Sequence, residues 1–364
     1  MKNIEEFIVP WVRQAESYND KHMDFAWSHP DVVRMMSNEN LIAPSQKIID
    51  AIQEAARLGN LYPDSGPKLR KKIGEMAGLT AENVMLGNGS TDVINVVIST
   101  LAAPGDEVLI SVPTFPMYET RTRVLGGVPI LVPMTPEFYW DIDKLIAAVT
   151  DKTKLIFICS PNNPTGNTID EDDLRRILNL GIPTFIDEAY YGLQNEVFSY
   201  AYLLKEYPNA IINRTFSKAY GLAGFRIGYA LASEKIISYL NRMKIPWNVG
   251  LVSLAAALAG VEDDEGNEFK RQNVIDGRNY ICEEINNIEG MHAYSSEGNF
   301  VLIDANCLNK KSSEIVDDII ARGIFIRPMT GHQMKQGFIR VTIGNPEQNR
   351  HFIEIFKAYI DQVS

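Results

Sequence analysis

The sequence has few cysteines and no spacing typical of a disulfide framework or a metal site. Only three of its 364 residues are cysteines, and they form no C-x-x-C pair. The five histidines are scattered along the chain without the short, regular gaps of metal ligands. We therefore expect reduced thiols, as in a reducing compartment, and no bound metal.

Long apolar runs and an excess of positive charge are also missing. No apolar run approaches the roughly 18 residues that span a bilayer, and the longest candidate, residues 93–103, is interrupted by Asn95, Ser99 and Thr100. The first residues carry acids and no apolar signal segment. Lys plus Arg number 35 against 46 Asp plus Glu, a net charge of −11. These features predict a cytoplasmic protein with no membrane and no nucleic-acid partner.

What the sequence does contain is an alternation of short strand-like runs with amphipathic stretches. The runs at residues 155–160 and 184–187 are almost wholly apolar and show no alternation. Strands of this kind are buried on both faces, as in a mostly parallel sheet covered by helices. The fold class is therefore predicted to be α/β. The expected strands are 84–86, 107–112, 128–132, 155–160, 184–187, 210–216 and 227–232, and the expected helices between them are 46–58, 90–101, 115–125, 141–149 and 171–178.

The C-terminal part of the chain has a different pattern. Helical segments dominate from residue 234, and strands are expected at 299–304, 325–327 and 338–342 before a last helix at 347–361. This pattern predicts a smaller α+β domain. We expect a boundary near residues 245–265, where proline and glycine are frequent.

Polar side chains follow several of the apolar strands. Lys218 comes after the strand 210–216, Asp187 ends the strand 184–187, and Asn163 stands in a Pro- and Gly-containing turn after the strand 155–160. In an α/β sheet ligands bind outside the carboxyl ends of the strands. Each residue also has a structural interpretation: a solvated lysine, a helix cap and an ordinary turn.

A small-residue turn and two arginines complete the set of candidates. The turn Gly87–Thr91 follows a strand and opens a helix, which is typical of an anion site, although Ser90 could simply cap the helix. Arg226 and Arg340 lie in largely apolar surroundings and need either an anionic ligand or a structural salt bridge. A phosphate cradle, an asparagine turn, an acid and a lysine are together what a pyridoxal 5′-phosphate site requires.

The sequence resembles the class I/II aminotransferases of fold type I, and within them the histidinol-phosphate aminotransferase branch. The motifs that carry the resemblance are SNEN (37–40), YPD (62–64), GNGSTD (87–92), PTFPMYE (113–119), PNNPTG (161–166), DEAY (187–190), TFSKAYGLAGFRIGY (215–229) and RVTIG (340–344). The resemblance implies pyridoxal 5′-phosphate, a seven-stranded sheet in a large domain (38–250) and a small domain from both chain ends (1–37 and 251–364).

The resemblance also implies roles for individual residues. Lys218 would be the catalytic lysine, binding the cofactor and moving the proton. The residues expected to bind the cofactor are Asp187 at the pyridine nitrogen, Asn163 and Tyr190 at the 3′-oxygen, Tyr118 stacked on the ring, and Gly89, Ser90, Thr91, Ser217 and Arg226 at the phosphate. Tyr62 would reach the cofactor phosphate of a neighbouring subunit, which implies a homodimer. Arg340, Arg327 and Asn38 are the candidates on the substrate side.

The function implied is transfer of an amino group between glutamate or 2-oxoglutarate and a small, phosphorylated amino or keto compound. The compound would be similar to histidinol phosphate or to a three-carbon amino alcohol phosphate. Residues 9–13 read VPWVR and lack the N-terminal Tyr-x-Pro-Gly pattern of the histidinol-phosphate branch, so the substrate itself stays open. The alternatives are a decarboxylase of phosphoserine or phosphothreonine type and a non-catalytic cofactor-binding regulator. The regulator would need a basic DNA-binding segment, which the sequence lacks.

Overall fold

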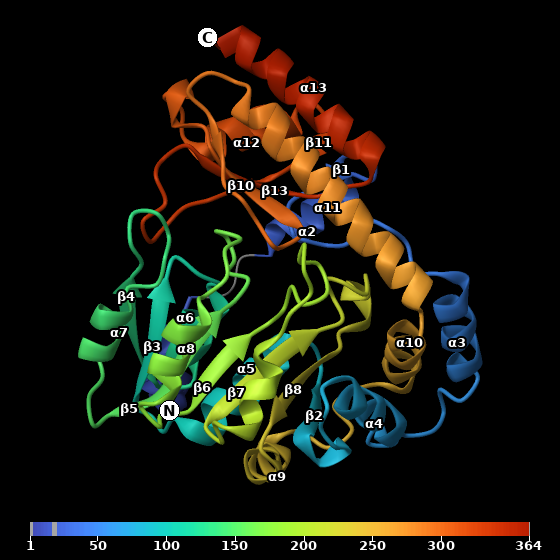
Figure 1. Ribbon diagram of the computed structural model, residues 1–364, viewed down its shortest axis with the longest axis vertical. Helices are drawn as coiled ribbons and strands as arrows, with labels where there is room; N and C mark the ends of the chain where they lie inside the picture. The colour runs from blue at the N-terminus through green and yellow to red at the C-terminus, as the bar shows by residue number, and fades with distance from the viewer. Residues whose placement is uncertain (1–2, 17–19, 364) are drawn as a thin grey trace.

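A seven-stranded sheet forms the centre of the computed structural model, which describes residues 3–16 and 20–363 (Figure 1). The strand order is β2-β8-β7-β6-β5-β3-β4. The strands are β2 (Val84–Gly87), β3 (Glu107–Val112), β4 (Val128–Pro133), β5 (Thr153–Cys159), β6 (Thr184–Asp187), β7 (Ala210–Thr215) and β8 (Gly228–Ala232). Only β8 runs antiparallel to its neighbours β7 and β2, so the predicted mostly parallel sheet is confirmed.

Helices cover both faces of this sheet and explain why its strands are mostly apolar. On one face the core is closed by α5 (Ser90–Leu101), α6 (Met117–Val124) and α9 (Glu234–Met243). On the other face lie α3 (Gln46–Ala56), α4 (Pro67–Met76), α7 (Ile142–Ala147), α8 (Glu171–Leu178), α10 (Leu251–Val261) and the 3₁₀ helix η3 (Tyr200–Lys205). Strands buried between two such layers gain from apolar side chains on both faces.

A second domain carries its own core and its own sheet. Four strands in the order β12-β13-β10-β9 pair antiparallel, and β1 (Val33–Arg34) pairs parallel with β11 (Ile324–Phe325). The four are β9 (His292–Ala293), β10 (Phe300–Asp304), β12 (Arg327–Pro328) and β13 (Phe338–Thr342). The helices are α2 (Lys21–Ser28), α11 (Asp264–Asn286), α12 (Ser312–Ile320) and α13 (Pro346–Val363). Figure 1 shows this domain above the sheet, with α11 descending toward α10.

Helix α10 (Leu251–Val261) packs with the large sheet, although it follows the expected domain limit at residue 250 and lies within the expected boundary region 245–265. The buried residues of α10, among them Leu254 and Val261, belong to the core around the large sheet, and α10 packs on α3. The small domain therefore begins with α11. The sequence of α10 is apolar on all sides, so it gave no sign of the sheet on which it packs.

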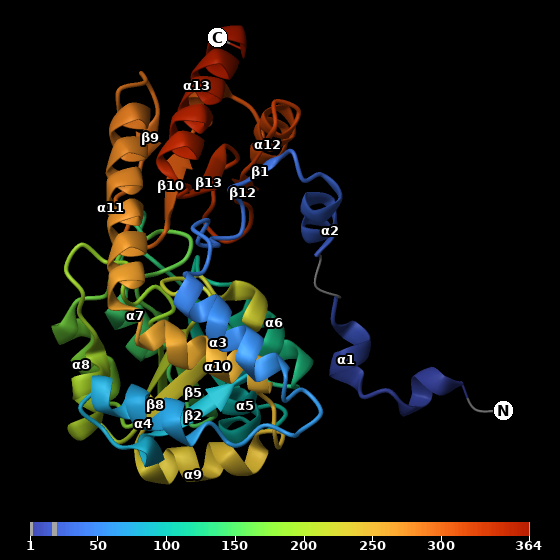
Figure 2. The same cartoon turned by 90° about the vertical axis from the view of Figure 1, so that its right-hand side faces the viewer.

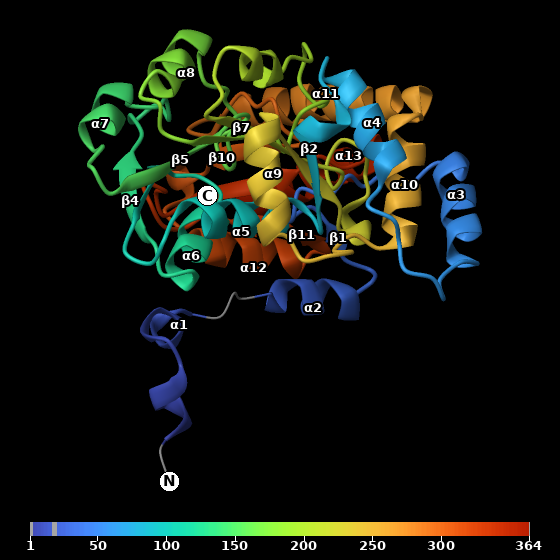
Figure 3. The same cartoon turned by 90° about the horizontal axis from the view of Figure 1, so that it is seen from below.

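The first described turn of the N-terminal segment points away from both domains, as Figures 2 and 3 show. The segment contains η1 (Ile4–Phe7) and α1 (Pro10–Gln14), and α1 contacts α6. The remaining short 3₁₀ helices are η2 (Ala81–Asn83), η4 (Ala223–Phe225) and η5 (Asn306–Leu308). Within the described ranges, none of these helices combines the length and apolar character needed to cross a membrane.

Candidate active site

The carboxyl ends of β5, β6 and β7 bring three predicted polar positions to one edge of the sheet. Asp187 ends β6, directly between Cys159 at the end of β5 and Asn213 on β7. Lys218 follows the end of β7 by three residues. The strand register therefore places the predicted acid and the lysine segment at the same edge, as the sequence predicts.

Lys218 contacts residues 37–38, which belong to the segment between β1 and α3. Its Nζ donates hydrogen bonds to the backbone carbonyls of Ser37, at 3.0 Å, and Asn38, at 2.8 Å. Burial, followed by the positive charge of Arg340, lowers the pKa of Lys218 from 10.5 to about 7. A lysine with such a pKa is a substantial fraction neutral amine near neutral pH, as a nucleophile or base requires.

Asp187 is almost wholly buried and its carboxylate is held from three directions. Oδ2 accepts a hydrogen bond from the hydroxyl of Tyr118 at 2.6 Å. Oδ1 accepts from Asn213 Nδ2 at 2.8 Å and from the backbone N–H of Ala189 at 3.0 Å. Burial raises the pKa of Asp187, and these donors act in the opposite direction.

The small-residue turn before α5 forms a cradle beside Arg226. Gly89 has a positive φ of 80°, and a Cβ placed there would lie 2.5 Å from Arg226 Nη2. Arg226 Nη1 donates to Ser217 Oγ at 3.4 Å. The residue after Gly89, Ser90, is the first of α5, where free backbone N–H groups favour an anion. These residues and the neighbouring Thr91 fit the phosphate of pyridoxal 5′-phosphate. The guanidinium of Arg226 lies beside the N-terminus of α5, and a side chain at Gly89 would clash with it.

A hydrogen-bond network joins the small domain to the asparagine turn. Asn38, with a positive φ of 52°, donates from Nδ2 to the hydroxyl of Tyr190 at 2.9 Å. Arg340 on β13 donates to Asn163 Oδ1 at 2.5 Å and to the carbonyl of Met36 at 2.9 Å. Two predicted substrate-side residues, Asn38 and Arg340, thus lie beside Tyr190 and Asn163.

Arg327 lies directly opposite Arg340 in the antiparallel pair β12–β13. Directly opposed residues project from the same face of a sheet, with Cβ atoms about 4.5–5.5 Å apart. Arg327 is half-buried, and within residues 3–16 and 20–363 its side chain makes no hydrogen bond or salt bridge. Two guanidinium groups therefore share one side of this sheet.

The ring of Tyr118 is packed on all sides by other aromatic residues. Its exposed fraction is 0%, its ring stacks on Phe157 at a centroid distance of 4.5 Å, and Phe115 and Phe185 meet it edge to face. No face of the ring is open for stacking on a cofactor. Phe115, three residues earlier in the same turn, is half-buried and is the better candidate for that contact.

Tyr62 lies outside this constellation. Its side chain is 82% exposed and stacks on Trp247 at a centroid distance of 5.0 Å. Trp247 is itself exposed and has a positive φ of 52°, which is rare for an aromatic residue. Within the one chain, Tyr62 therefore contacts none of the residues predicted to bind the cofactor.

Two contacts of the site were not predicted from the sequence. Asn213, which donates to Asp187, and Ser37, whose carbonyl accepts from Lys218, were not among the candidates. Asn213 had a visible signal, because it is a polar residue within the apolar strand 210–216. The carbonyl of Ser37 had none, since every residue carries one.

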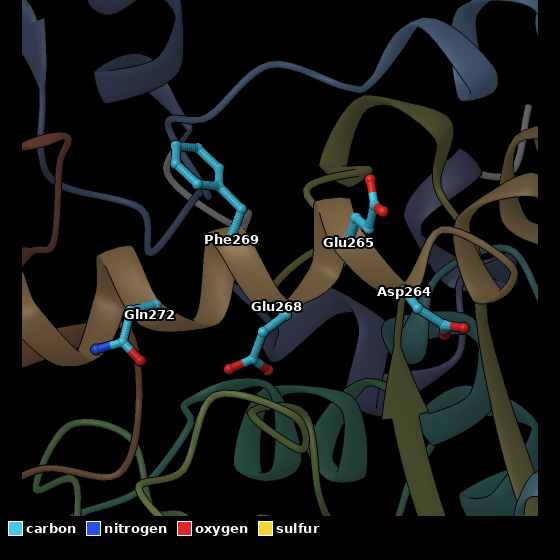
Figure 4. A pocket seen from close by; sticks show the side chains of 5 residues that line it. All are labelled: Asp264, Glu265, Glu268, Phe269 and Gln272. Atoms are coloured by element: carbon cyan, nitrogen blue, oxygen red, sulfur yellow. The ribbon is translucent and has the colours of Figure 1, made fainter.

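A surface hollow along the start of α11 is separate from this site. It is lined by Asp264, Glu265, Glu268, Phe269 and Gln272. Figure 4 shows these side chains projecting from the helix in several directions. None of the predicted site residues lines it.

Comparison with known proteins agrees with this geometry. Residues 30–356 match the family model of aminotransferase class I and II. The chain belongs to this family. A histidinol-phosphate aminotransferase of Methanosarcina mazei is 35% identical over 99% of this chain and 96% of its own length. An aromatic amino acid aminotransferase of Rhodococcus opacus is 34% identical over 90% of each chain.

The fold agrees with that of a solved aminotransferase. The histidinol-phosphate aminotransferase of Sinorhizobium meliloti in complex with pyridoxal-5′-phosphate superposes with a TM-score of 0.84 at 23% identity, covering 97% of this chain and 98% of that chain. The predicted fold type I is therefore confirmed. The chain is a pyridoxal-phosphate-dependent aminotransferase, as its family membership and the curated relatives establish.

Proposed function

We propose that this aminotransferase moves an amino group between glutamate or 2-oxoglutarate and a small phosphorylated amino or keto compound similar to histidinol phosphate. The observation that carries the proposal is the pair Arg327 and Arg340, which lie opposite each other on one face of the small-domain sheet, with Arg340 donating a hydrogen bond to Asn163. Like charges placed directly opposite each other destabilise a sheet unless an anion lies between them. A phosphate dianion, or the carboxylate of glutamate, supplies that charge.

The contacts of the two arginines support this assignment. Arg340 donates hydrogen bonds to Asn163 Oδ1 and to the Met36 carbonyl, so its guanidinium lies beside the asparagine turn proposed to bind the cofactor. The guanidinium of Arg327 has no hydrogen-bonding partner in the described parts of the chain. Guanidinium groups bind phosphate and carboxylate oxygens in a bidentate way, so one pair can accept either substrate anion in turn.

The other residues are proposed to hold the cofactor and to move the proton. When bound, pyridoxal 5′-phosphate withdraws electrons from the substrate carbon that loses its proton. Asp187 would keep the ring nitrogen protonated, and Asn163 and Tyr190 would bind the ring oxygen. Gly89, Ser90, Thr91, Ser217 and Arg226 would bind the phosphate. Lys218, neutral at a pKa of about 7, would take up the proton and return it at Nζ.

We further propose that the active form is a homodimer. Tyr62 and Trp247 form an exposed aromatic pair that no contact within the described chain covers. Exposed aromatic side chains of this size are typical of an interface. In the dimer Tyr62 would reach the cofactor phosphate of the second subunit.

An amino-acceptor and donor panel tests the proposal. Purified protein is supplied with 2-oxoglutarate and either histidinol phosphate, a three-carbon amino alcohol phosphate, or each compound without its phosphate. Glutamate formation is expected with a phosphorylated compound, and removal of the phosphate should lower kcat/KM by at least about tenfold, because a charge-assisted contact is lost. Phosphoserine and phosphothreonine are added in parallel without 2-oxoglutarate. Release of carbon dioxide there, with no glutamate elsewhere, would overturn the proposal in favour of a decarboxylase.

A further inference from the structure

The hydrogen bonds on Asp187 occupy specific positions on its carboxylate. A carboxylate offers about four acceptor positions, two on each oxygen. Both positions on Oδ1 are filled, by Asn213 Nδ2 at 2.8 Å and the N–H of Ala189 at 3.0 Å. Oδ2 receives the hydroxyl of Tyr118 at 2.6 Å, which leaves one position on that oxygen.

Tyr118 is itself fixed by packing on all sides. Its ring is 0% exposed and stacks on Phe157, with an angle of 14° between the two planes. A second stabilising contact is the hydrogen bond within α6 from Thr122 Oγ1 to the backbone carbonyl of Tyr118. Burial and the charge of Asp187 raise the pKa of the phenol, so it is a neutral donor at any physiological pH.

We propose that Tyr118 is a positioning residue, whose hydroxyl fixes the carboxylate of Asp187 and leaves a single position on Oδ2 for the protonated ring nitrogen of the cofactor. The inference rests on the proposed contact between Asp187 and that nitrogen. Tyr118 and the nitrogen would then share one oxygen, so the phenol sets both the direction of the acceptor and the charge that the ring nitrogen meets.

Tyr118→Phe removes the donor and keeps the ring. The hydrogen bond lowers the pKa of Asp187, so its loss should raise that pKa and move the acid limb of the kcat profile to higher pH. Binding of pyridoxal 5′-phosphate to the apoprotein, followed by absorbance, should weaken about tenfold, the usual effect of losing one hydrogen bond to a charged group.

A double-mutant cycle separates this role from a packing role. In an Asp187→Asn background the same Tyr118→Phe change should alter cofactor affinity by less than about twofold, because the carboxylate on which it acts is gone. Tyr200→Phe is the matched control. It removes another buried phenol, whose hydroxyl donates to the carbonyl of Ile169, and it should leave cofactor affinity unchanged.

Two results would overturn the inference. One concerns Tyr118 alone, and the other also concerns the proposed contact between Asp187 and the cofactor. An equal loss of affinity from Tyr118→Phe in both backgrounds would show that the hydroxyl acts through packing and not through Asp187. Unchanged affinity in Asp187→Asn alone would overturn the contact between Asp187 and the cofactor as well, and with it the site assignment proposed above.

Discussion

Lys218 owes its lowered pKa mainly to burial, and nearby charges shift that pKa in both directions. Burial contributes most, Arg340 adds a like charge, and Glu39 and Asp187 act in the opposite direction. The resulting pKa of about 7 means that the neutral amine predominates above that pH, where an ordinary lysine would be almost wholly charged. The small domain thus influences the pKa of Lys218, because Arg340 comes from β13.

The rate at which the apoprotein binds pyridoxal 5′-phosphate should follow this titration. We expect the rate to rise with pH around a midpoint near 7, and Arg340→Gln to move the midpoint to higher pH because it removes a like charge. Arg57→Gln, an exposed site on the far end of α3, serves as the control and should leave the midpoint unchanged. A midpoint above 9 in the unmodified protein would contradict this account of Lys218.

The sequence could nominate Lys218 and Asp187 because each follows an apolar strand, and strand ends meet at one edge of a sheet. It could not predict what Tyr118 contacts. The direction of that ring depends on how α6 packs against Phe157 of β5, and such packing has no spacing signal. The resemblance to the family placed an aromatic residue of this motif on the cofactor, and the packing of Tyr118 favours Phe115 for that contact.

At the scale of elements, a buried ion pair connects the catalytic strands. Arg214 on β7 pairs with Glu188, which follows β6, at 2.9 Å, and both side chains are almost wholly buried. The guanidinium of Arg214 also lies 3.5 Å from the ring centre of Tyr191. The residue after Asp187 is thus attached to the neighbouring strand, which helps to fix the strand ends on which the site is built.

Breaking this pair should destabilise the fold strongly. Arg214→Met leaves the Glu188 carboxylate buried without its partner, and the free energy of unfolding should fall by about 3–5 kcal/mol. Arg175→Met, which removes exposed ion pairs with Glu171 and Glu206, should cost about 1 kcal/mol or less. Urea denaturation of both variants measures the difference. An equal loss of unfolding free energy in the two variants would show that the buried ion pair stabilises the fold no more than the exposed ones.

Elements with strong local signals were predicted best. The helices α5 and α8 were predicted with the observed bounds, and Asp170 caps α8 as the acid-rich start of that segment suggests. Helix α4 was missed because its sequence is highly charged and only Leu69, Ile73 and Gly74 are buried. The strand expected at 325–327 is two short strands in different sheets, a division that depends on tertiary pairing.

For the whole molecule, the site residues brought together within one chain do not include Tyr62. Its exposed pairing with Trp247 is explained if both side chains meet a second copy of the chain. The two-domain arrangement then has a simple meaning. In the proposed site the large domain would supply the cradle and the lysine, the small domain the arginines, and a second subunit Tyr62.

Subunit mixing tests whether Tyr62 acts across the interface. Lys218→Ala and Tyr62→Ala proteins should each have low activity, and dimers that combine one subunit of each should regain activity, since one of their two sites has an intact Lys218 and an intact Tyr62. Mixing Lys218→Ala with Asp187→Asn protein is the control and should restore nothing, because both residues act within one chain. If the mixture of Lys218→Ala and Tyr62→Ala subunits stays inactive, Tyr62 acts on the site of its own subunit or on no site at all.

The most direct test of the central claim is the half-reaction with glutamate alone. Holoenzyme is mixed with glutamate in the absence of any acceptor, and the absorbance of the bound cofactor is followed. Amino transfer predicts a stoichiometric change to the amine form of the cofactor with one 2-oxoglutarate released per site, and no change in Lys218→Ala protein. A phosphorylated keto compound should then restore the original spectrum. An unchanged spectrum with every amino donor tried, or carbon dioxide in place of 2-oxoglutarate, would contradict the account.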